Sequence, residues 1–79
     1  MSLQIVETKF GKVRLQKINE VTWFCGKDVC DVLGFINSKK AINDYCNKED
    51  VTKIRKINFV NESGLYSLIF GLHKNSHNH

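Results

Sequence analysis

The stretch of residues 23–45, WFCGKDVCDVLGFINSKKAINDY, constrains the fold of this chain more than any other segment. Its pattern predicts a strand that ends at Cys25, a short helix stopped by Gly34, and a second short helix after a joint at residues 35–38. Two short helices across a glycine-containing turn are typical of nucleic-acid-binding units. The stretch therefore indicates a binding module rather than an assembled catalytic site.

The first helix is expected to depend on its neighbours for stability. Val29, Val32 and Leu33 fall at i, i+3 and i+4 and give it one apolar face. Asp28 in the first turn suits the positive end of the helix dipole. Because a helix of about two turns does not persist alone in water, we expect it to pack on a preceding hairpin, around Trp23.

The second helix carries a cationic face. Ser38 is the expected N-cap. Lys39 and Lys40 lie in the first turn, where their charge opposes the helix dipole at a cost of about a few tenths of a kcal/mol each. A bound phosphate would turn this cost into an advantage, because helix N-termini favour anions; the alternative is a solvated charged face. The inward positions are Ala41, Ile42 and Tyr45, and the outward ones are Lys39, Lys40, Asn43 and Asp44.

Strands are expected on both sides of this helical stretch. Residues 3–10 begin with a β-prone segment, and alternating runs at residues 13–16 and 21–25 predict a β-hairpin. In residues 51–60, VTKIRKINFV, the apolar face switches between Ile54 and Ile57, which predicts a bulge, a bend or two short strands. The segment can follow a phosphate backbone or serve as a soluble edge strand. Its basic cluster consists of Lys53, Arg55 and Lys56.

The last element shows the clearest helical period in the sequence. From Leu65 onward, apolar residues recur at i, i+3, i+4 and i+7, and a second apolar pair widens the surface. Such a helix calls for a further segment or subunit to cover it. The predicted partner or dimer surface comprises Leu65, Tyr66, Ile69 and Phe70. Residues 1–72 are expected to form one domain, and the polar residues 73–79 a disordered tail.

Composition narrows the class of protein. A chain of 79 residues suffices for one small domain, and its net charge of +4 favours polyanionic partners. Without a run of about 18 apolar residues or a secretory signal, we expect an intracellular protein with no membrane partner. The three cysteines are expected to be buried reduced thiols, because Cys-x-x-Cys spacing is missing. The alternative is a zinc site that combines Cys25 and Cys30 with Cys46 or a tail histidine.

No motif predicts an enzyme. Glycine-rich phosphate loops, paired-carboxylate motifs, metal signatures and nucleophile motifs are missing from the sequence. Asp28, Asp31 and Glu62 are interpreted as helix caps or surface charges, so no catalytic residue, cofactor or metal is expected. The predicted fold class is α+β: a small β-hairpin or antiparallel sheet, with two short helices inserted and a C-terminal amphipathic helix.

Three blocks of residues stand out along the chain. The first block comprises Val13-Arg14, Trp23-Phe24, Lys27-Asp28-Val29 and Val32-Leu33-Gly34. The second is the Asn-x-x-Lys-Ala-Ile stretch of residues 37–42, and the third is NESGLYSLI at residues 61–69. In this order, over nearly the whole chain, the blocks resemble the N-terminal domain of the BRO family, which baculovirus repeated open reading frame proteins share with phage antirepressors.

The resemblance implies an α+β module that binds DNA, found in large DNA viruses and temperate phages. A viral member would act in the host cytoplasm or nucleus. BRO-type proteins are associated with DNA and nucleosome binding, and their phage relatives with relief of repression. Family members usually continue past the last helix into a basic segment with an Arg-Trp pair, and here the sequence departs from that pattern.

The function predicted from these observations is DNA binding, mostly independent of base sequence, in transcriptional regulation. Asn43 is the residue suited to bidentate recognition of adenine. The alternative is a protein-interaction module that grips a repressor, or forms a homodimer, through the apolar C-terminal helix. The residues predicted to contact DNA are Lys39, Lys40, Asn43, Lys53, Arg55 and Lys56.

Overall fold

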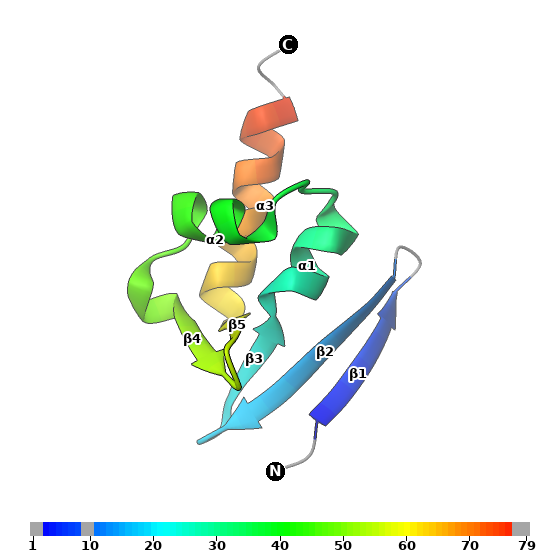
Figure 1. Cartoon of the computed structure of the whole chain (residues 1–79), viewed down its shortest axis with the longest axis vertical. Coiled ribbons are helices and arrows are strands. Elements are labelled where there is room, and N and C mark those ends of the chain that lie inside the picture. The colour runs from blue at the N-terminus through cyan, green and yellow to red at the C-terminus, as the bar shows by residue number, and fades with distance from the viewer. Residues whose placement is uncertain (1–2, 9–10, 77–79) are drawn as a thin grey trace.

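A computed structural model describes residues 3–8 and 11–76 of the chain and shows an α+β fold, as the sequence predicted (Figure 1). Five antiparallel strands form one sheet in the order β1-β2-β3-β5-β4. In chain order the elements are β1 (Leu3–Thr8), β2 (Gly11–Ile18), β3 (Val21–Cys25), α1 (Gly26–Leu33), α2 (Ser38–Tyr45), the 3-10 turn η1 (Lys48–Asp50), β4 (Val51–Ile54), β5 (Ile57–Val60) and α3 (Glu62–Ser76).

The β2–β3 and β4–β5 hairpins each close through a two-residue turn. β2 and β3 form the predicted hairpin, and residues 19 and 20 between them both have positive φ. Residues 51–60 form a second hairpin in which Ile54 pairs with Ile57. Its turn residues, Arg55 and Lys56, have φ of 52° and 69°, the left-handed conformation that a two-residue hairpin turn requires. The switch of the apolar face in the sequence thus marks two short strands.

α1 packs against the sheet, but through different side chains from those expected. Its core partners are Val13 on β2 and Val60 on β5, with Phe24 packed against the same cluster. Phe24 lies opposite Leu15 in the register, whereas Trp23 lies opposite Gln16. Because successive residues of a strand point to opposite faces, Trp23 projects from the other face of the sheet. The expectation that α1 packs around Trp23 was therefore wrong, and Phe24 takes that place.

The joint between α1 and α2 is held at both ends. α1 ends at Gly34 as predicted, with φ of 92°, and the backbone N–H groups of Gly34 and Phe35 both donate to the Cys30 carbonyl at 2.9 Å. At the other end, Oδ1 of Asn37 accepts from the backbone N–H of Lys40 at 3.0 Å. Asn37 is therefore the N-cap of α2, and the prediction of Ser38 was wrong by one residue.

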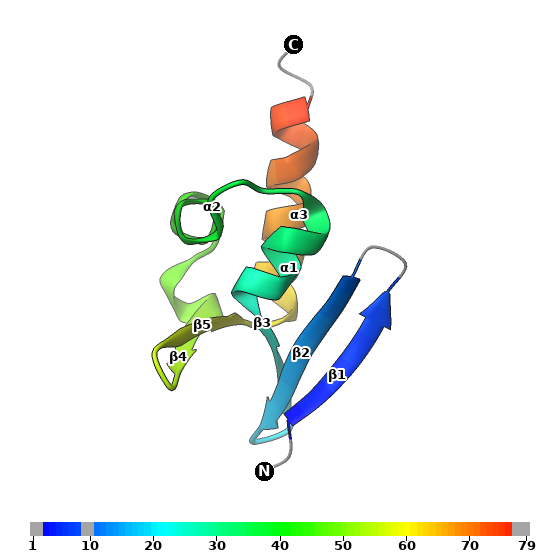
Figure 2. The ribbon, with the colours of Figure 1, turned by 45° about the vertical axis from the view of Figure 1, so that its right-hand side comes forward.

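α3 packs against α1, α2 and the central strands β3 and β5, and it closes the core there (Figure 2). Leu68 is fully buried, and Leu65 packs against the core cluster. Gly71 allows α3 to approach α2 closely, since a Cβ there would lie 2.6 Å from Cγ of Tyr45.

α3 extends to Ser76, beyond the predicted start of the tail at residue 73, and residues 77–79 lie outside the described part of the chain. No helix in the described residues is long and apolar enough to span a membrane.

Candidate nucleic-acid interface

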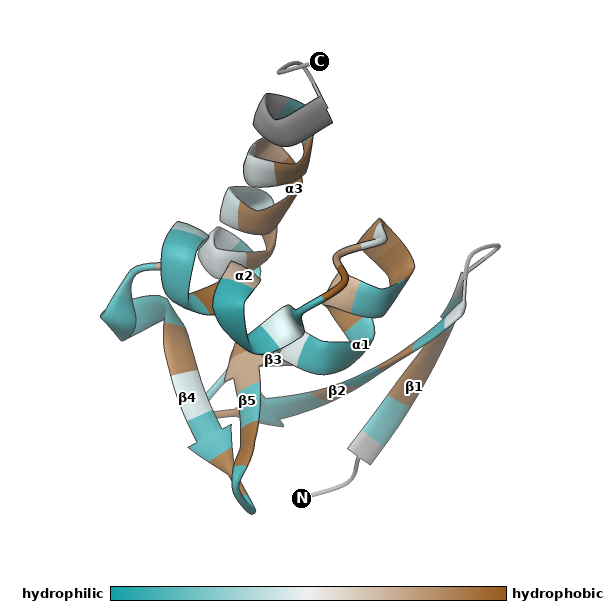
Figure 3. Ribbon diagram, turned by 45° about the horizontal axis from the view of Figure 1, so that its top comes forward, coloured by the Kyte–Doolittle hydropathy of each residue, from teal (hydrophilic) through white to brown (hydrophobic). Residues whose placement is uncertain are grey.

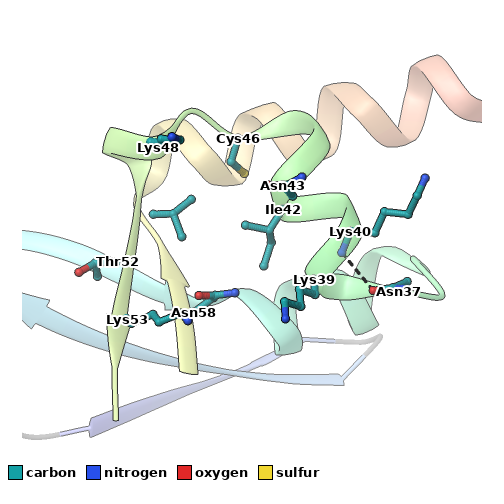
Figure 4. Close-up of a pocket in the computed structure, with 11 residues that line it drawn as sticks. Asn37, Lys39, Lys40, Ile42, Asn43, Cys46, Lys48, Thr52, Lys53 and Asn58 are labelled. Carbon is teal, nitrogen blue, oxygen red and sulfur yellow. Dashed lines mark hydrogen bonds between the residues drawn. The ribbon is translucent and has the colours of Figure 1, made fainter. Parts of the chain in front are cut away.

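A groove of about 700 Å³ lies between α2 and the β4–β5 hairpin (Figure 4). Its walls carry lysine and asparagine side chains, but most of its lining surface is apolar, including a floor that contains Ile42 and Val51. The side chains that line it are Asn37, Lys39, Lys40, Ile42, Asn43, Cys46, Lys48, Val51, Thr52, Lys53 and Asn58. Segments far apart in the sequence therefore contribute to one surface.

The helical wall follows from the amphipathic pattern of α2. Ala41 and Ile42 are buried against the core, which turns Lys39, Lys40 and Asn43 outward, where all three are exposed. Figure 3 shows the outer side of α2 as hydrophilic. The predicted inward positions of this helix are thus confirmed.

The opposite wall comes from the hairpin and the turn before it. Lys53 on β4 is the register partner of Asn58 on β5, so both side chains leave the same face of the sheet. In Figure 4 they lie across the groove from Lys39, and Lys48 of η1 lies at the far end. Val51 contributes to the apolar floor between these polar groups.

The structure brings together some of the predicted DNA contacts and separates others. Four of the six predicted residues line the groove: Lys39, Lys40, Asn43 and Lys53. Arg55 and Lys56 are exposed at the tip of the β4–β5 hairpin and do not line it. The groove also contains Asn37, Lys48 and Asn58, which the sequence interpretation did not select.

The sequence contains a signal for two of these additional residues, Asn58 and Asn37. Asn58 shares the groove with Lys53 because the hairpin pairs them, a relationship that appears once residues 51–60 are divided into two strands. Asn37 belongs to the polar joint before α2 and was overlooked because Ser38 also fits the cap position. Lys48 lies in the polar segment of residues 47–50, whose pattern gives no signal for a binding wall.

Lys40, one of the lysines of the groove, forms an exposed ion pair with Asp44 on the same helix. Nζ of Lys40 lies 3.5 Å from Oδ2 of Asp44, with side-chain exposures of 72% and 45%. An exposed pair of this type contributes little stability because water screens it. The ammonium group of Lys40 can therefore exchange this carboxylate for another anion at small cost.

Two cysteines near the groove, Cys30 and Cys46, have thiols of raised pKa. Burial, reinforced by the charge of Asp50, raises the pKa of Cys46 to about 11, and its Sγ donates to the Gly64 carbonyl at 3.4 Å. Burial also raises the pKa of Cys30 to about 12, with the nearby groups of Cys46, Asp31 and Cys25 acting in the same direction. Thiols of such high pKa remain protonated at neutral pH, which makes them poor nucleophiles. Within residues 3–8 and 11–76, no three His, Cys, Asp or Glu side chains form a group that could hold a metal ion.

Asp28 has a larger structural role than a helix cap. Its carboxylate forms an ion pair with Arg14 on β2, with 2.8 Å between Nε and Oδ2. Burial raises the pKa of Asp28, but hydrogen bonds from the side chain and backbone of Arg14, together with its charge, outweigh burial and lower the pKa overall. The interpretation of Asp28 as a cap or surface charge was therefore incomplete, whereas Asp31 and Glu62 are exposed as expected.

A second surface lies on the outer side of α3. Tyr66 and Phe70 are 59% and 71% exposed and border a hollow of about 390 Å³ beside Asp44 and Tyr45 of α2. Of the other residues predicted for a partner surface, Ile69 is half-buried and Leu65 packs against the core. Leu65 and Ile69 are therefore only partly available to that surface.

Comparison with known proteins links these patterns to a family. Residues 12–78 match the model of the BRO family, N-terminal domain. The chain is 46% identical over 55 residues to an uncharacterized protein of Haemophilus influenzae, covering 60% of the chain and 27% of that protein. It is 35% identical over 49 residues to the Putative Bro-N domain-containing protein 289L of Invertebrate iridescent virus 6, covering 58% of the chain and 12% of that protein. The match thus spans less than a third of either relative. No solved structure gives a significant match.

Proposed function

This chain belongs to the BRO family, because residues 12–78 match the N-terminal domain of that family, and on that premise we propose that it is a DNA-binding module that acts in the regulation of transcription. Its partner is duplex DNA, bound mostly through phosphates and without a cofactor or an enzymatic reaction. The protein would then act inside the cell and, if it is viral, in the host cytoplasm or nucleus.

One observation carries the proposal: cationic side chains from three separate elements line a single groove. Lys39 and Lys40 come from α2, Lys48 from η1 and Lys53 from β4. Lysines on both sides of one groove match a polyanion, whose phosphates they can neutralise. Arg55 and Lys56 at the hairpin tip extend the positive surface beyond the groove.

The polar amides of the groove supply a means of reading bases. Asn43 is exposed on α2, and Asn58 lies on the opposite wall. An asparagine amide can form two hydrogen bonds with adenine in the major groove. Lysine contacts to phosphates hold the duplex in place without distinguishing its sequence. We therefore expect strong salt dependence with a modest preference for particular bases.

The proposal is tested by fluorescence anisotropy with a labelled duplex of mixed sequence at several salt concentrations. If the four groove lysines and the two cations of the hairpin tip all contact phosphates, log K should fall with log salt at a slope of about −5. The Lys39→Ala/Lys40→Ala variant should bind more weakly, with a slope shallower by about 2.

The matched control is Lys12→Ala. Lys12 is an exposed lysine that pairs in register with Glu7 on β1, at the edge of the sheet opposite β4. This variant should bind DNA as the wild type does. A folded wild-type protein that fails to bind at low salt would overturn the proposal, and equal losses in both variants would show that the groove is not the contact surface.

A protein-interaction module is the second candidate, favoured by the exposure of Tyr66 and Phe70 beside the hollow on α3. In this role the surface would grip a repressor or a second copy of the chain. Sedimentation velocity over a range of concentrations should then show association that Phe70→Ser weakens. A monomer at every concentration, with no binding to a repressor, would contradict this candidate.

A further inference from the structure

Ile36, in the joint between α1 and α2, is completely exposed, with a relative exposure of 104%. The exposed aromatic side chains of α3 retain more contact with the fold than this isoleucine does. Figure 2 shows the joint as the green connection between the two helices. The Ile36 side chain therefore contributes nothing to the core and is fully available to a partner.

The joint presents Ile36 rigidly. On one side, the N–H of Phe35 donates to the Cys30 carbonyl at 2.9 Å, and the Phe35 ring packs at 5.9 Å between centroids from that of Tyr45. On the other side, the Asn37 side chain caps α2. Ile36 is therefore held between two anchored neighbours, which lowers the entropy lost when it binds.

The surroundings of Ile36 are polar and cationic. Asn37 follows directly in the chain and lines the groove together with Lys39 and Lys40. Gly34, two residues earlier, has nothing within 4 Å of the position that a Cβ would occupy, so the space beside the joint is open. A protein-binding surface would need a contiguous apolar patch, whereas Ile36 is a single exposed apolar side chain that directly precedes Asn37, which lies at one end of the groove (Figure 4). This combination favours a polyanion that also offers an apolar site.

Duplex DNA offers such a site between its stacked base pairs. We propose that Ile36 is a wedge that inserts between adjacent base pairs of the duplex held in the groove, an inference that rests on the proposed DNA-binding function. Architectural DNA-binding proteins insert isoleucine, leucine or phenylalanine in this way and bend the duplex by unstacking one step. Pyrimidine–purine steps should be preferred, because they unstack most easily.

The test uses a short duplex with 2-aminopurine at a central TA step and a donor–acceptor dye pair at its ends. Wild-type binding should raise the 2-aminopurine fluorescence and shorten the end-to-end distance, because the wedge unstacks and bends the duplex. Ile36→Ser should remove both signals and weaken binding by about three- to tenfold. Ile36→Phe should preserve both signals.

The matched control is Ile5→Ser, the same chemical change at a 59% exposed isoleucine of β1, far from the groove in the order of the sheet. It should leave affinity and both optical signals unchanged. Because Ile36 is fully exposed, its variants should keep the wild-type circular dichroism and melting temperature.

The outcomes separate the two proposals. A wild-type protein that binds DNA with no rise in fluorescence, or an Ile36→Ser complex with wild-type signals, overturns the wedge and leaves DNA binding intact. Failure of the wild-type protein to bind any duplex at low salt overturns both. Equal changes in DNA affinity and in both optical signals for Ile5→Ser and Ile36→Ser would also overturn the wedge.

Discussion

Arg14 and Asp28 fasten β2 to the first turn of α1 through one carboxylate. Nε of Arg14 donates to Oδ2 at 2.8 Å, its terminal guanidinium nitrogen donates to Oδ1 at 3.2 Å, and its backbone N–H donates to Oδ2 at 3.0 Å. α1 leads directly into the joint and α2. This pair therefore helps to fix the helical wall of the groove on the sheet.

Asp28→Asn should lower the free energy of unfolding by about 1–2 kcal/mol at neutral pH, after allowance for solvent screening of the 38% exposed Arg14 side chain. The pKa of Asp28 is lowered in the folded chain. A carboxyl group of this kind stabilises the fold above its unfolded pKa of about 3.9, and this contribution is lost as pH falls through the folded value. Urea unfolding of both proteins should therefore show a smaller difference at about pH 3 than at about pH 7. The same difference at both pH values would contradict the role given to this pair.

Asn37→Ala should destabilise the protein by about 1 kcal/mol, because it removes the side-chain acceptor for the Lys40 N–H. Ser38→Ala should change stability by less than about 0.5 kcal/mol, since Ser38 is the first residue of α2 and not its cap. Chemical denaturation of the two variants measures both values. A larger loss of stability from Ser38→Ala than from Asn37→Ala would identify Ser38 as the N-cap.

Gly71→Ala should destabilise the fold by about 1–3 kcal/mol, because the added methyl group overlaps the ring of Tyr45. In a Tyr45→Leu background the same substitution should be less damaging, since the smaller side chain leaves room for the methyl group. A double-mutant cycle from thermal or urea unfolding gives the coupling between the two positions. Independent, additive losses would show that α2 and α3 do not meet through this contact.

Lys48→Ala and Lys53→Ala should each make the salt dependence of DNA binding shallower by about 0.9 in slope. Both lysines line the groove, although they come from η1 and β4 rather than α2. As both are exposed, neither substitution should change stability by more than about 0.5 kcal/mol. Anisotropy titrations at several salt concentrations measure the slopes. A normal slope for both variants would confine the DNA contacts to α2 and the hairpin tip.

Patterns within a few residues predicted the secondary structure well. The apolar spacing in α1 and α2 and the position of Gly34 gave both helices, and alternation gave the β2–β3 hairpin. The errors lie between adjacent residues. Asn37 and Ser38 both suit an N-cap, and Trp23 and Phe24 point to opposite faces of a strand. Which strand residue enters the core depends on the face of the sheet that the helices cover. Which residue caps α2 depends on where that helix begins. No local pattern contains either piece of information.

The sequence by itself determined the elements, the cationic outer face of α2 and the basic cluster of residues 53–56. Only the tertiary structure decided that Lys53 joins Lys39 and Lys40 in one groove while Arg55 and Lys56 remain at the hairpin tip. The physical reason is that groove formation depends on non-local burial: Ile42 of α2 and Val60 of β5 enter one core. That shared core sets α2 opposite the hairpin, and the register of β4 and β5 then turns Lys53 and Asn58 toward it.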